Sequence, residues 1–290
     1  MSNATSARAT SPTPSDSGNA RGPAVFSVTP DVWGMRTLIV NAYLATADDA
    51  ERWVLIDAGL PGTAGAILGT AHHLFPARAP ASVVLTHADF DHVGAVSAIL
   101  RRWPETPVFV HPLEVPYVTG QLSYPPPDPA VGGGWMARLS PLFPKHPYNF
   151  GAAVQKLPDD GTVPFLSGWR WIHTPGHTPG QISLFRTRDH LLIAGDAITT
   201  VRQENVRAVW RQTPEVRPPP AYFTIDWRLA YESMRELAGL DPRLAATGHG
   251  VPMAGNLLRD QLSALLAHFP ERGLPQKGRY VHQTWTTTAP

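Results

Sequence analysis

The sequence Thr86-His87-Ala88-Asp89-Phe90-Asp91-His92 constrains the fold of this chain more than any other stretch. It places two imidazoles and two carboxylates side by side, directly after Ala81-Ser82-Val83-Val84-Leu85, an apolar run typical of a short buried strand. Crowded carboxylates repel each other, and a bound divalent cation would relieve that repulsion. The segment therefore predicts half of a metal site on a loop at the end of a strand.

A simpler interpretation is that these polar residues form a surface turn or cap the helix expected over residues 93–102. Three later segments favour the metal site, because each puts a ligand-type side chain at a strand end or a tight turn. His177 lies between two Pro-Gly pairs, and Asp196 and His249 each follow an apolar run. His249 is also flanked by glycines, which permit a close approach of the backbone.

Taken together, these residues resemble the metallo-β-lactamase superfamily, whose ligand pattern is His-x-His-x-Asp-His followed by a distant His, then Asp, then His. The resemblance covers residues from about 25 to about 269. The chain departs from the pattern once, at Asp89, where the family has its second histidine. The resemblance implies an α/β fold, a four-layer αβ/βα sandwich with two facing mixed β-sheets inside and helices outside.

The resemblance also implies two divalent metal ions per chain, either zinc, manganese or iron. The ligands would be His87, Asp89 and His177 for the first ion, Asp91, His92 and His249 for the second, and Asp196 as a bridge. Asp91 would also handle the proton that the reaction moves. Asp57, which follows the predicted strand 53–56, would orient a ligand histidine or a metal-bound water, or else cap the helix after Pro61.

The carboxylate at Asp89 bears on the identity of the metal. In place of an imidazole it makes the first position harder and more negative, which favours manganese or iron somewhat more than a histidine-rich site does. Zinc also accepts carboxylate oxygen as a ligand, so Asp89 would make the preference for manganese or iron stronger without excluding zinc. The alternative is that Asp89 is not a ligand and the first position is weak or empty. The chain has 0 cysteines, which excludes thiolate ligands, disulfides and iron–sulfur clusters.

A strand followed by an aspartate, and later a strand followed by a histidine, occurs twice in the chain. This repetition predicts a duplicated unit with the metal ions between the two copies. The expected strands cover residues 53–56, 82–85, 108–110, 191–194 and 244–246. Helical spacing of apolar residues is found over residues 63–74, 93–102, 227–240 and 256–269.

The domain is expected to span residues 23–270. Residues 1–22 are rich in Ser, Thr, Ala and Pro and lack the apolar core of a secretory signal, which predicts a disordered N-terminal tail. Residues 271–290 are expected to form a C-terminal tail. An irregular segment at about 112–150, rich in proline and aromatic residues, predicts a lid, a pocket wall or a subunit interface.

From that segment Trp135 is a candidate to contact a substrate, and Tyr222 is a second candidate from the irregular stretch 206–223. The predicted activity is hydrolysis of an ester, a lactone or a related carbonyl of an apolar small molecule, with a metal-bridging hydroxide as the attacking group. The alternatives are a glyoxalase-II-like thioesterase, a di-iron oxidoreductase that works with a separate redox partner, and a metal-binding scaffold without activity.

The charge and hydropathy of the chain narrow the range of partners. The net charge of +1 gives no reason to expect nucleic-acid binding. No apolar run approaches the roughly 20 residues of a membrane helix, so no membrane partner is expected. Without cysteines or an export signal, we expect a cytoplasmic protein, either a monomer or a homodimer.

Overall fold

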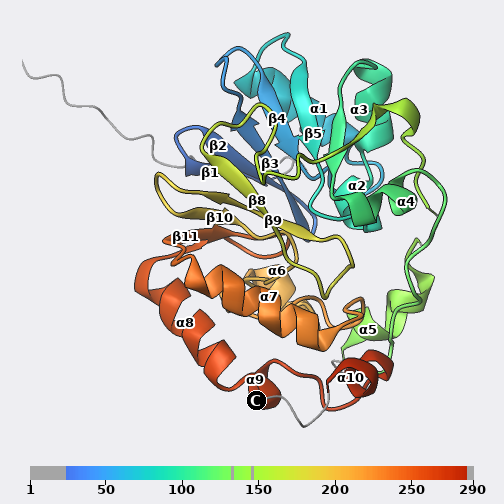
Figure 1. The fold of residues 1–290 in the computed structure, drawn as a ribbon, viewed down its shortest axis with the longest axis vertical. Coiled ribbons are helices and arrows are strands. Elements are labelled where there is room, and N and C mark those ends of the chain that lie inside the picture. The colour runs from blue at the N-terminus through green and yellow to red at the C-terminus, as the bar shows by residue number, and fades with distance from the viewer. Residues whose placement is uncertain (1–23, 132–133, 145–146, 286–290) are drawn as a thin grey trace, which may run out of the picture.

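The computed structural model describes residues 24–131, 134–144 and 147–285, so the N-terminal tail expected over residues 1–22 lies outside them. The described residues form the predicted four-layer sandwich, with two β-sheets face to face and helices on their outer sides (Figure 1). The first sheet contains β1 (Ala24–Thr29), β2 (Val32–Thr37), β3 (Val40–Thr46), β4 (Trp53–Ile56), β5 (Pro80–Val84), β6 (Val108–Val110) and β7 (Val154–Lys156), in that order.

The second sheet has the order β12-β11-β10-β9-β8. Its strands are β8 (Trp169–His173), β9 (Ile182–Arg186), β10 (Leu191–Ile193), β11 (Leu244–Ala246) and β12 (Met253–Ala254). Both sheets are mixed, because β4 pairs with β5 and β10 pairs with β11 in parallel while hairpin neighbours pair antiparallel. The carboxyl ends of each parallel pair meet at one sheet edge, as the repeated pattern of strand-end residues predicts.

The helices cover the outer faces of the sheets. Helices α1 (Ala64–Leu74) and α3 (Val96–Arg102) lie on the first sheet, and α7 (Trp227–Gly239) and α8 (Gly255–Ala267) lie on the second (Figure 1). Helix α7 begins where the Asp226 side chain accepts a hydrogen bond of 2.9 Å from Leu229 N. Its buried residues recur with helical spacing, so one face packs on the sheet.

Three apolar layers alternate with the four layers of secondary structure. All four residues of β4 are buried, but Leu55 packs among the residues under α1 and α3, whereas Val54 and Ile56 pack between the two sheets. Strand β10 repeats this arrangement, with Leu192 under α7 and α8 and its neighbours between the sheets. The side-chain period of two explains why a strand that is buried on both faces is apolar throughout.

The helix predicted over residues 93–102 is present as α3 with the predicted end, but it begins at Val96, after the separate short helix α2 (Phe90–Val93). The cause lies in the backbone between them. Gly94 N donates to Gly59 O at 2.8 Å, and Ala95 N donates to Ala58 O at 3.1 Å, in place of helical bonds. A side chain on Gly94 would overlap the backbone at Pro61. This break lets the loop after β4 pack directly against the His92 segment.

The irregular segment contains short helical turns: η1 (Pro112–Glu114), α4 (Val115–Val118), α5 (Trp135–Leu139), η2 (Ser140–Leu142) and η3 (Gly151–Ala153). The second irregular stretch includes α6 (Val206–Arg211), and the chain ends with α9 (Phe269–Arg272) and α10 (Arg279–Thr284).

Residues 286–290 of the C-terminal tail expected over residues 271–290 lie outside the described ranges, but the part of it up to Trp285 is folded onto the domain. Tyr280 and Val281 of α10 are buried in the core under the second sheet, and the Tyr280 hydroxyl donates to Pro126 O at 2.6 Å. The folded domain therefore continues to about Trp285. None of the helices within the described ranges is long and apolar enough to cross a membrane.

Candidate metal centre

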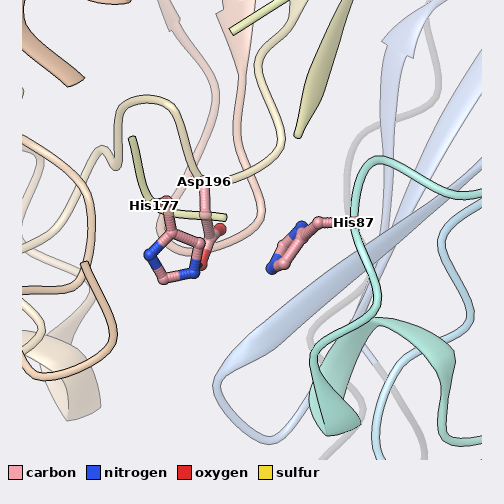
Figure 2. A group of neighbouring side chains, drawn as sticks. All are labelled: His87, His177 and Asp196. Carbon is pink, nitrogen blue, oxygen red and sulfur yellow. The ribbon is translucent and has the colours of Figure 1, made fainter. Parts of the chain in front are cut away.

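Six of the seven predicted ligands form two compact groups at the edge where the carboxyl ends of the parallel strands meet. One group contains His87, His177 and Asp196, and the other contains Asp91, His92 and His249. Within each group, one ligand atom per residue lies within 4.8 Å of the others, and all six side chains are buried. Figure 2 shows His87, from the first sheet, directed at His177 and Asp196 from the second half of the chain.

Asp196 lies between the two groups. Its Oδ2 atom is 3.8 Å from His177 Nε2 in the first group, and 3.6 and 3.1 Å from His92 Nε2 and His249 Nε2 in the second. A single carboxylate oxygen is thus close to nitrogen atoms of both groups, which is the geometry that a bridging ligand requires.

Asp89 and Asp91 lie at the outer side of this cluster. Asp89 Oδ2 is 3.1 Å from His177 Nε2 and 3.6 Å from His87 Nε2, and Asp91 Oδ2 is 3.5 Å from His249 Nε2. Asp89 therefore has an oxygen beside the first group, at the place where the sequence pattern predicts a ligand, although it is not one of the three residues that define that group.

Two of the histidines direct Nδ1 at a group that can only accept a hydrogen bond. His92 Nδ1 lies 2.8 Å from Asp57 Oδ2, and His249 Nδ1 lies 2.8 Å from the backbone oxygen of Ile39. The Nδ1 atom must therefore carry the proton in both neutral rings. As a result, Nε2 of each ring presents a lone pair toward Asp196.

In the other two histidines, a threonine hydroxyl beside Nδ1 likewise favours the tautomer with the proton on Nδ1. His87 Nδ1 is 3.0 Å from Thr86 Oγ1, which donates its own proton to Asp57 Oδ2 at 2.7 Å. His177 Nδ1 is 3.4 Å from Thr224 Oγ1, which donates to a backbone oxygen at 2.9 Å. Because each hydroxyl already donates its proton elsewhere, it can only accept a hydrogen bond from the histidine ring. In this tautomer all four Nε2 atoms present lone pairs to a bound cation, whereas without a cation His177 Nε2 would have to donate to Asp89 Oδ2 at 3.1 Å.

This donor set fits two divalent cations. His87 Nε2, His92 Nε2 and Asp196 Oδ1 are buried and have no hydrogen-bond partner among the described residues. A buried acceptor without a hydrogen-bond partner costs free energy. A cation bound between several such acceptors would remove that cost. Imidazole nitrogen with carboxylate oxygen suits zinc, manganese or iron.

The charges of the buried carboxylates also favour positive charge within the cluster. Burial raises the pKa of the Asp196 carboxyl, but His249 and His92 outweigh this and hold it well below its usual range. Burial lowers the pKa of His92, and the charges of Asp196, Asp57 and Asp91 more than reverse this. The carboxylates thus favour either protonated histidines or bound cations between them.

Several residues around the cluster hold its ligands in place. Asp57 has a left-handed backbone (φ 58°) and accepts from Thr86 N at 2.7 Å as well as from His92. Across the site, Asn41 Nδ2 of β3 donates to Thr247 O at 2.9 Å and to Gly250 O at 2.7 Å, on both sides of His249. The loop that carries His249 is therefore fastened to the opposite sheet.

Glycine is required beside the bridging residue. A Cβ atom on Gly248 would overlap Asp196 Oδ1 and lie 2.6 Å from His92 Cε1. The absence of a side chain at this position keeps the space between the two sheets open for the ligands.

An apolar pocket opens beside Asp89. Its lining includes Ala88, Asp89, Phe90, Tyr117, Leu122, Ser123, Tyr124, Pro125, Pro127, Pro144, Pro147, Tyr148 and Phe223. Most of these residues belong to the irregular segment between β6 and β7, so this segment forms a pocket wall in the described residues.

The two candidate substrate residues lie in different surroundings. Tyr222 is buried, and burial together with the charges of Asp91, Glu204 and Asp196 raises the pKa of its phenol well above the usual value. Trp135 is 66% exposed on α5, beside Arg202 and Asn205, and is not among the described residues that line the apolar pocket. The structure therefore does not bring Trp135 to the metal centre.

Sequence reasoning missed Glu114. Its carboxylate is fully buried and accepts hydrogen bonds from the backbone of Ala88 and Gly180 and from the hydroxyls of Tyr124 and Thr178. Burial raises the pKa of this carboxyl. No spacing rule connects the partners, which are up to 66 positions away in the chain. His111 lies nearby but stacks on His173, with ring centroids 4.2 Å apart, and belongs to neither metal group.

Comparison with known proteins places the chain in a family. The family profile "Metallo-beta-lactamase superfamily" matches residues 35–249. The chain is 46% identical over 249 residues to "Probable metallo-hydrolase YflN" of Bacillus subtilis, a match covering 85% of this chain and 94% of that protein. It is also 40% identical to a hydroxyacylglutathione hydrolase of Pectobacterium atrosepticum, over 52% of this chain and 45% of that protein.

Solved structures agree on the fold. A β-lactamase domain protein from Burkholderia ambifaria superposes with a TM-score of 0.61 at 19% identity, covering 85% of this chain and 73% of that one. TTHA1623, solved in a di-iron-bound form, superposes with a TM-score of 0.51 at 24% identity, covering 83% and 96% of the two chains. At such identities the structures support the fold alone. The family profile and the two facing sheets together show that this chain belongs to the metallo-β-lactamase superfamily.

Proposed function

We propose that the protein is a hydrolase that uses two divalent metal ions to cleave an ester, a lactone or a related carbonyl bond in a small apolar molecule. The observation that carries the proposal is the convergence of four imidazole Nε2 atoms and three carboxylates, one of which, Asp89, also lines an aromatic pocket. The similarity to probable metallo-hydrolases of Bacillus subtilis supports the reaction class.

The first ion would be held by His87, Asp89 and His177, the second by Asp91, His92 and His249, and both by Asp196. When bound, two such ions polarise a carbonyl and lower the pKa of water to about 7, which is the chemistry that carbonyl hydrolysis needs. The preference for manganese or iron over zinc would depend on Asp89, the harder ligand of the set.

The substrate would approach over Asp89 and Asp91. Their side chains are 10% and 12% exposed, whereas the side chains of Asp196 and the four histidines are at most 3% exposed. Asp91 would therefore be the carboxylate that meets the reacting atoms and moves the proton. Tyr222, whose phenol is affected by the charges of Asp91 and Asp89, would contact the substrate from the opposite loop.

The pocket beside Asp89 would take the apolar part of the substrate. Tyr117 and Tyr124 stack in its wall with ring centroids 4.1 Å apart, and the rings of Phe90 and Phe223, with centroids 6.4 Å apart, also line it. The free volume of the pocket is about 40 Å³, so it would take the end of a narrow acyl group, whose carbonyl would then lie on the side of Asp89. Buried apolar area then contributes binding energy of roughly 25 cal/mol per Å².

The proposal is tested by hydrolysis of a panel of nitrophenyl esters, lactones and thioesters of increasing chain length. The assay uses the purified protein, the protein stripped with a chelator, and the protein reloaded separately with zinc, manganese or iron. We expect activity that disappears on stripping, returns with metal and increases with acyl length. His177→Gln should abolish it, whereas His73→Gln, at an exposed position of α1, should not. Activity that survives chelation would refute the proposal.

A thioesterase is the second candidate, because about half of the chain matches a hydroxyacylglutathione hydrolase. The same panel separates the two, since a thioesterase prefers the thioester over the oxygen ester with the same acyl group. Metal-dependent oxygen consumption without hydrolysis would instead support an oxidoreductase.

A further inference from the structure

Glu114 lies at the junction of the two halves of the metal centre. It comes from η1, directly after β6, and its side chain extends inward until it is 0% exposed. A buried carboxylate is costly unless its oxygens are satisfied, and each oxygen of Glu114 accepts two hydrogen bonds.

One oxygen of Glu114 holds the loop of the first sheet. Oε2 accepts from Ala88 N at 3.1 Å and from the hydroxyl of Tyr124. Ala88 is the residue between His87 and Asp89, so this bond fixes the backbone that carries both. The hydroxyl of Tyr124 also lies 2.9 Å from Ala88 N, and its ring lines the apolar pocket.

The other oxygen holds the loop of the second sheet. Oε1 accepts from Thr178 Oγ1 at 2.9 Å and from Gly180 N at 2.8 Å. Thr178 directly follows His177. A Cβ atom on Gly180 would lie 2.8 Å from Glu114 Cγ and 2.9 Å from Oε1, so the glycine permits this close approach. The second metal group has no such connection to Glu114, because His92 and His249 are held by Asp57 and Ile39.

We propose that Glu114 is a positioning residue for the first metal position, because its one carboxylate ties the loop of His87 and Asp89 to the loop of His177. This inference rests on the proposed metal centre and concerns metal affinity, not the substrate. Partners behind metal ligands typically change affinity by 10 to 100-fold when they are mutated. A carboxylate that spans two loops sets the distance between ligands that arise 88 positions apart in the chain.

The test compares Glu114→Gln and Glu114→Asp with the wild-type protein. The glutamine keeps the length but replaces one acceptor oxygen with a donor, which then faces a backbone or hydroxyl donor. The aspartate keeps the charge but is one methylene too short to reach both loops. Cobalt(II) is titrated into the stripped proteins in competition with a coloured chelator, and the d–d spectrum is recorded at each equivalent.

We expect the affinity of one of the two sites to fall by about 10 to 100-fold in both variants, with an altered spectrum for that site only. The affinity of the other site should stay within about twofold. Asp128→Asn is the matched control, since Asp128 is a buried carboxylate in the same segment that accepts from Ala130 N and Arg279 N and touches neither ligand loop.

Equal loss at both sites, or an equal effect of Asp128→Asn, would mean that Glu114 only stabilises the fold and would overturn the inference. Unchanged affinities in both Glu114 variants would overturn it as well. The result does not depend on hydrolysis. If the wild-type protein binds two ions but cleaves no substrate, the proposed reaction fails while the role of Glu114 stands on its own titration.

Discussion

The substitution Asp57→Asn tests the proton arrangement on which the metal centre depends. Asp57 accepts three hydrogen bonds, from Thr86 N, from Thr86 Oγ1 and from His92 Nδ1, at 2.7, 2.7 and 2.8 Å. Asparagine has the same shape and also tolerates the left-handed backbone at this position, so the change removes an acceptor without straining the chain.

The asparagine has two orientations, and each disturbs a different partner. With its oxygen toward His92, its NH₂ group opposes Thr86 N, and a buried N–H without an acceptor costs about 1–3 kcal/mol. With its NH₂ group toward His92, the ring must accept at Nδ1 and carry its proton on Nε2, the atom that faces the metal. Thr86 Oγ1, which donates to the same Asp57 oxygen, then loses its acceptor as well. For a neutral His92 ring we expect the second orientation in the stripped protein, because moving the proton from one ring nitrogen to the other costs little.

Binding of the second metal ion then requires the reversal of that orientation. The cost of about 1–3 kcal/mol corresponds to a loss of affinity of about 5 to 150-fold. The thermal stability of the stripped protein should change little. The assay is competition with a coloured chelator at pH 7.5, together with thermal unfolding of the stripped protein.

The control is Asp160→Asn. Asp160 is an exposed residue that accepts from Thr162 N and Thr162 Oγ1, bonds that an asparagine oxygen can retain. We expect wild-type affinity in this variant. If Asp57→Asn binds both ions as tightly as the wild type and is equally stable when stripped, the assigned protonation of His92 is wrong.

Two further predictions concern the metal ligands, and a third concerns His111, which lies outside both metal groups. Asp196→Ala should reduce bound metal from two equivalents to less than one, by elemental analysis, and unchanged metal content would exclude a bridging role. Asp89→His should shift selectivity toward zinc in competition with manganese, and an identical selectivity would show that Asp89 is not a ligand. Burial, with the neighbouring His173, lowers the pKa of His111 to about 4. Since the unfolded state binds that proton from about pH 6.5, stability should decrease from pH 6.5 to 4 by on the order of 1 kcal/mol, and His111→Asn should remove this part of the pH dependence of chemical denaturation.

The positions of the metal groups could be predicted because the chemistry limits both residue type and place. Only His, Asp and Glu were available as strong ligands in a chain with 0 cysteines, and each predicted ligand lies in a loop just after a short apolar run or, for His177, between two Pro-Gly pairs. The strands over 53–56, 108–110 and 244–246 have the predicted bounds, since short buried runs bounded by turn residues leave little freedom.

The remaining features depend on contacts between distant residues. Glu114 has no local pattern, because its partners come from loops on both sheets. The late start of the predicted helix 93–102 arises from backbone hydrogen bonds to Gly59 and Ala58. The spacing of apolar residues along the helix cannot reveal such bonds. Trp135 belongs to a segment that does line the pocket, but the direction of α5 leaves its ring toward solvent. The packing of α10 likewise depends on Pro126 and Asp128, far away in sequence.

The attachment of the His249 loop to β3 has a consequence for biosynthesis. The ribosome synthesises Asn41 and the loop from His87 to His92 well before His249. The residues that hold the His249 loop, Asn41 and the backbone oxygen of Ile39, are therefore made before the loop itself. The emerging chain thus offers incomplete ligand sets that hold metal weakly. If the chain binds the two proposed ions, complete ligand sets form only after the second sheet docks, and the binding energy of the metal would then stabilise only fully folded molecules.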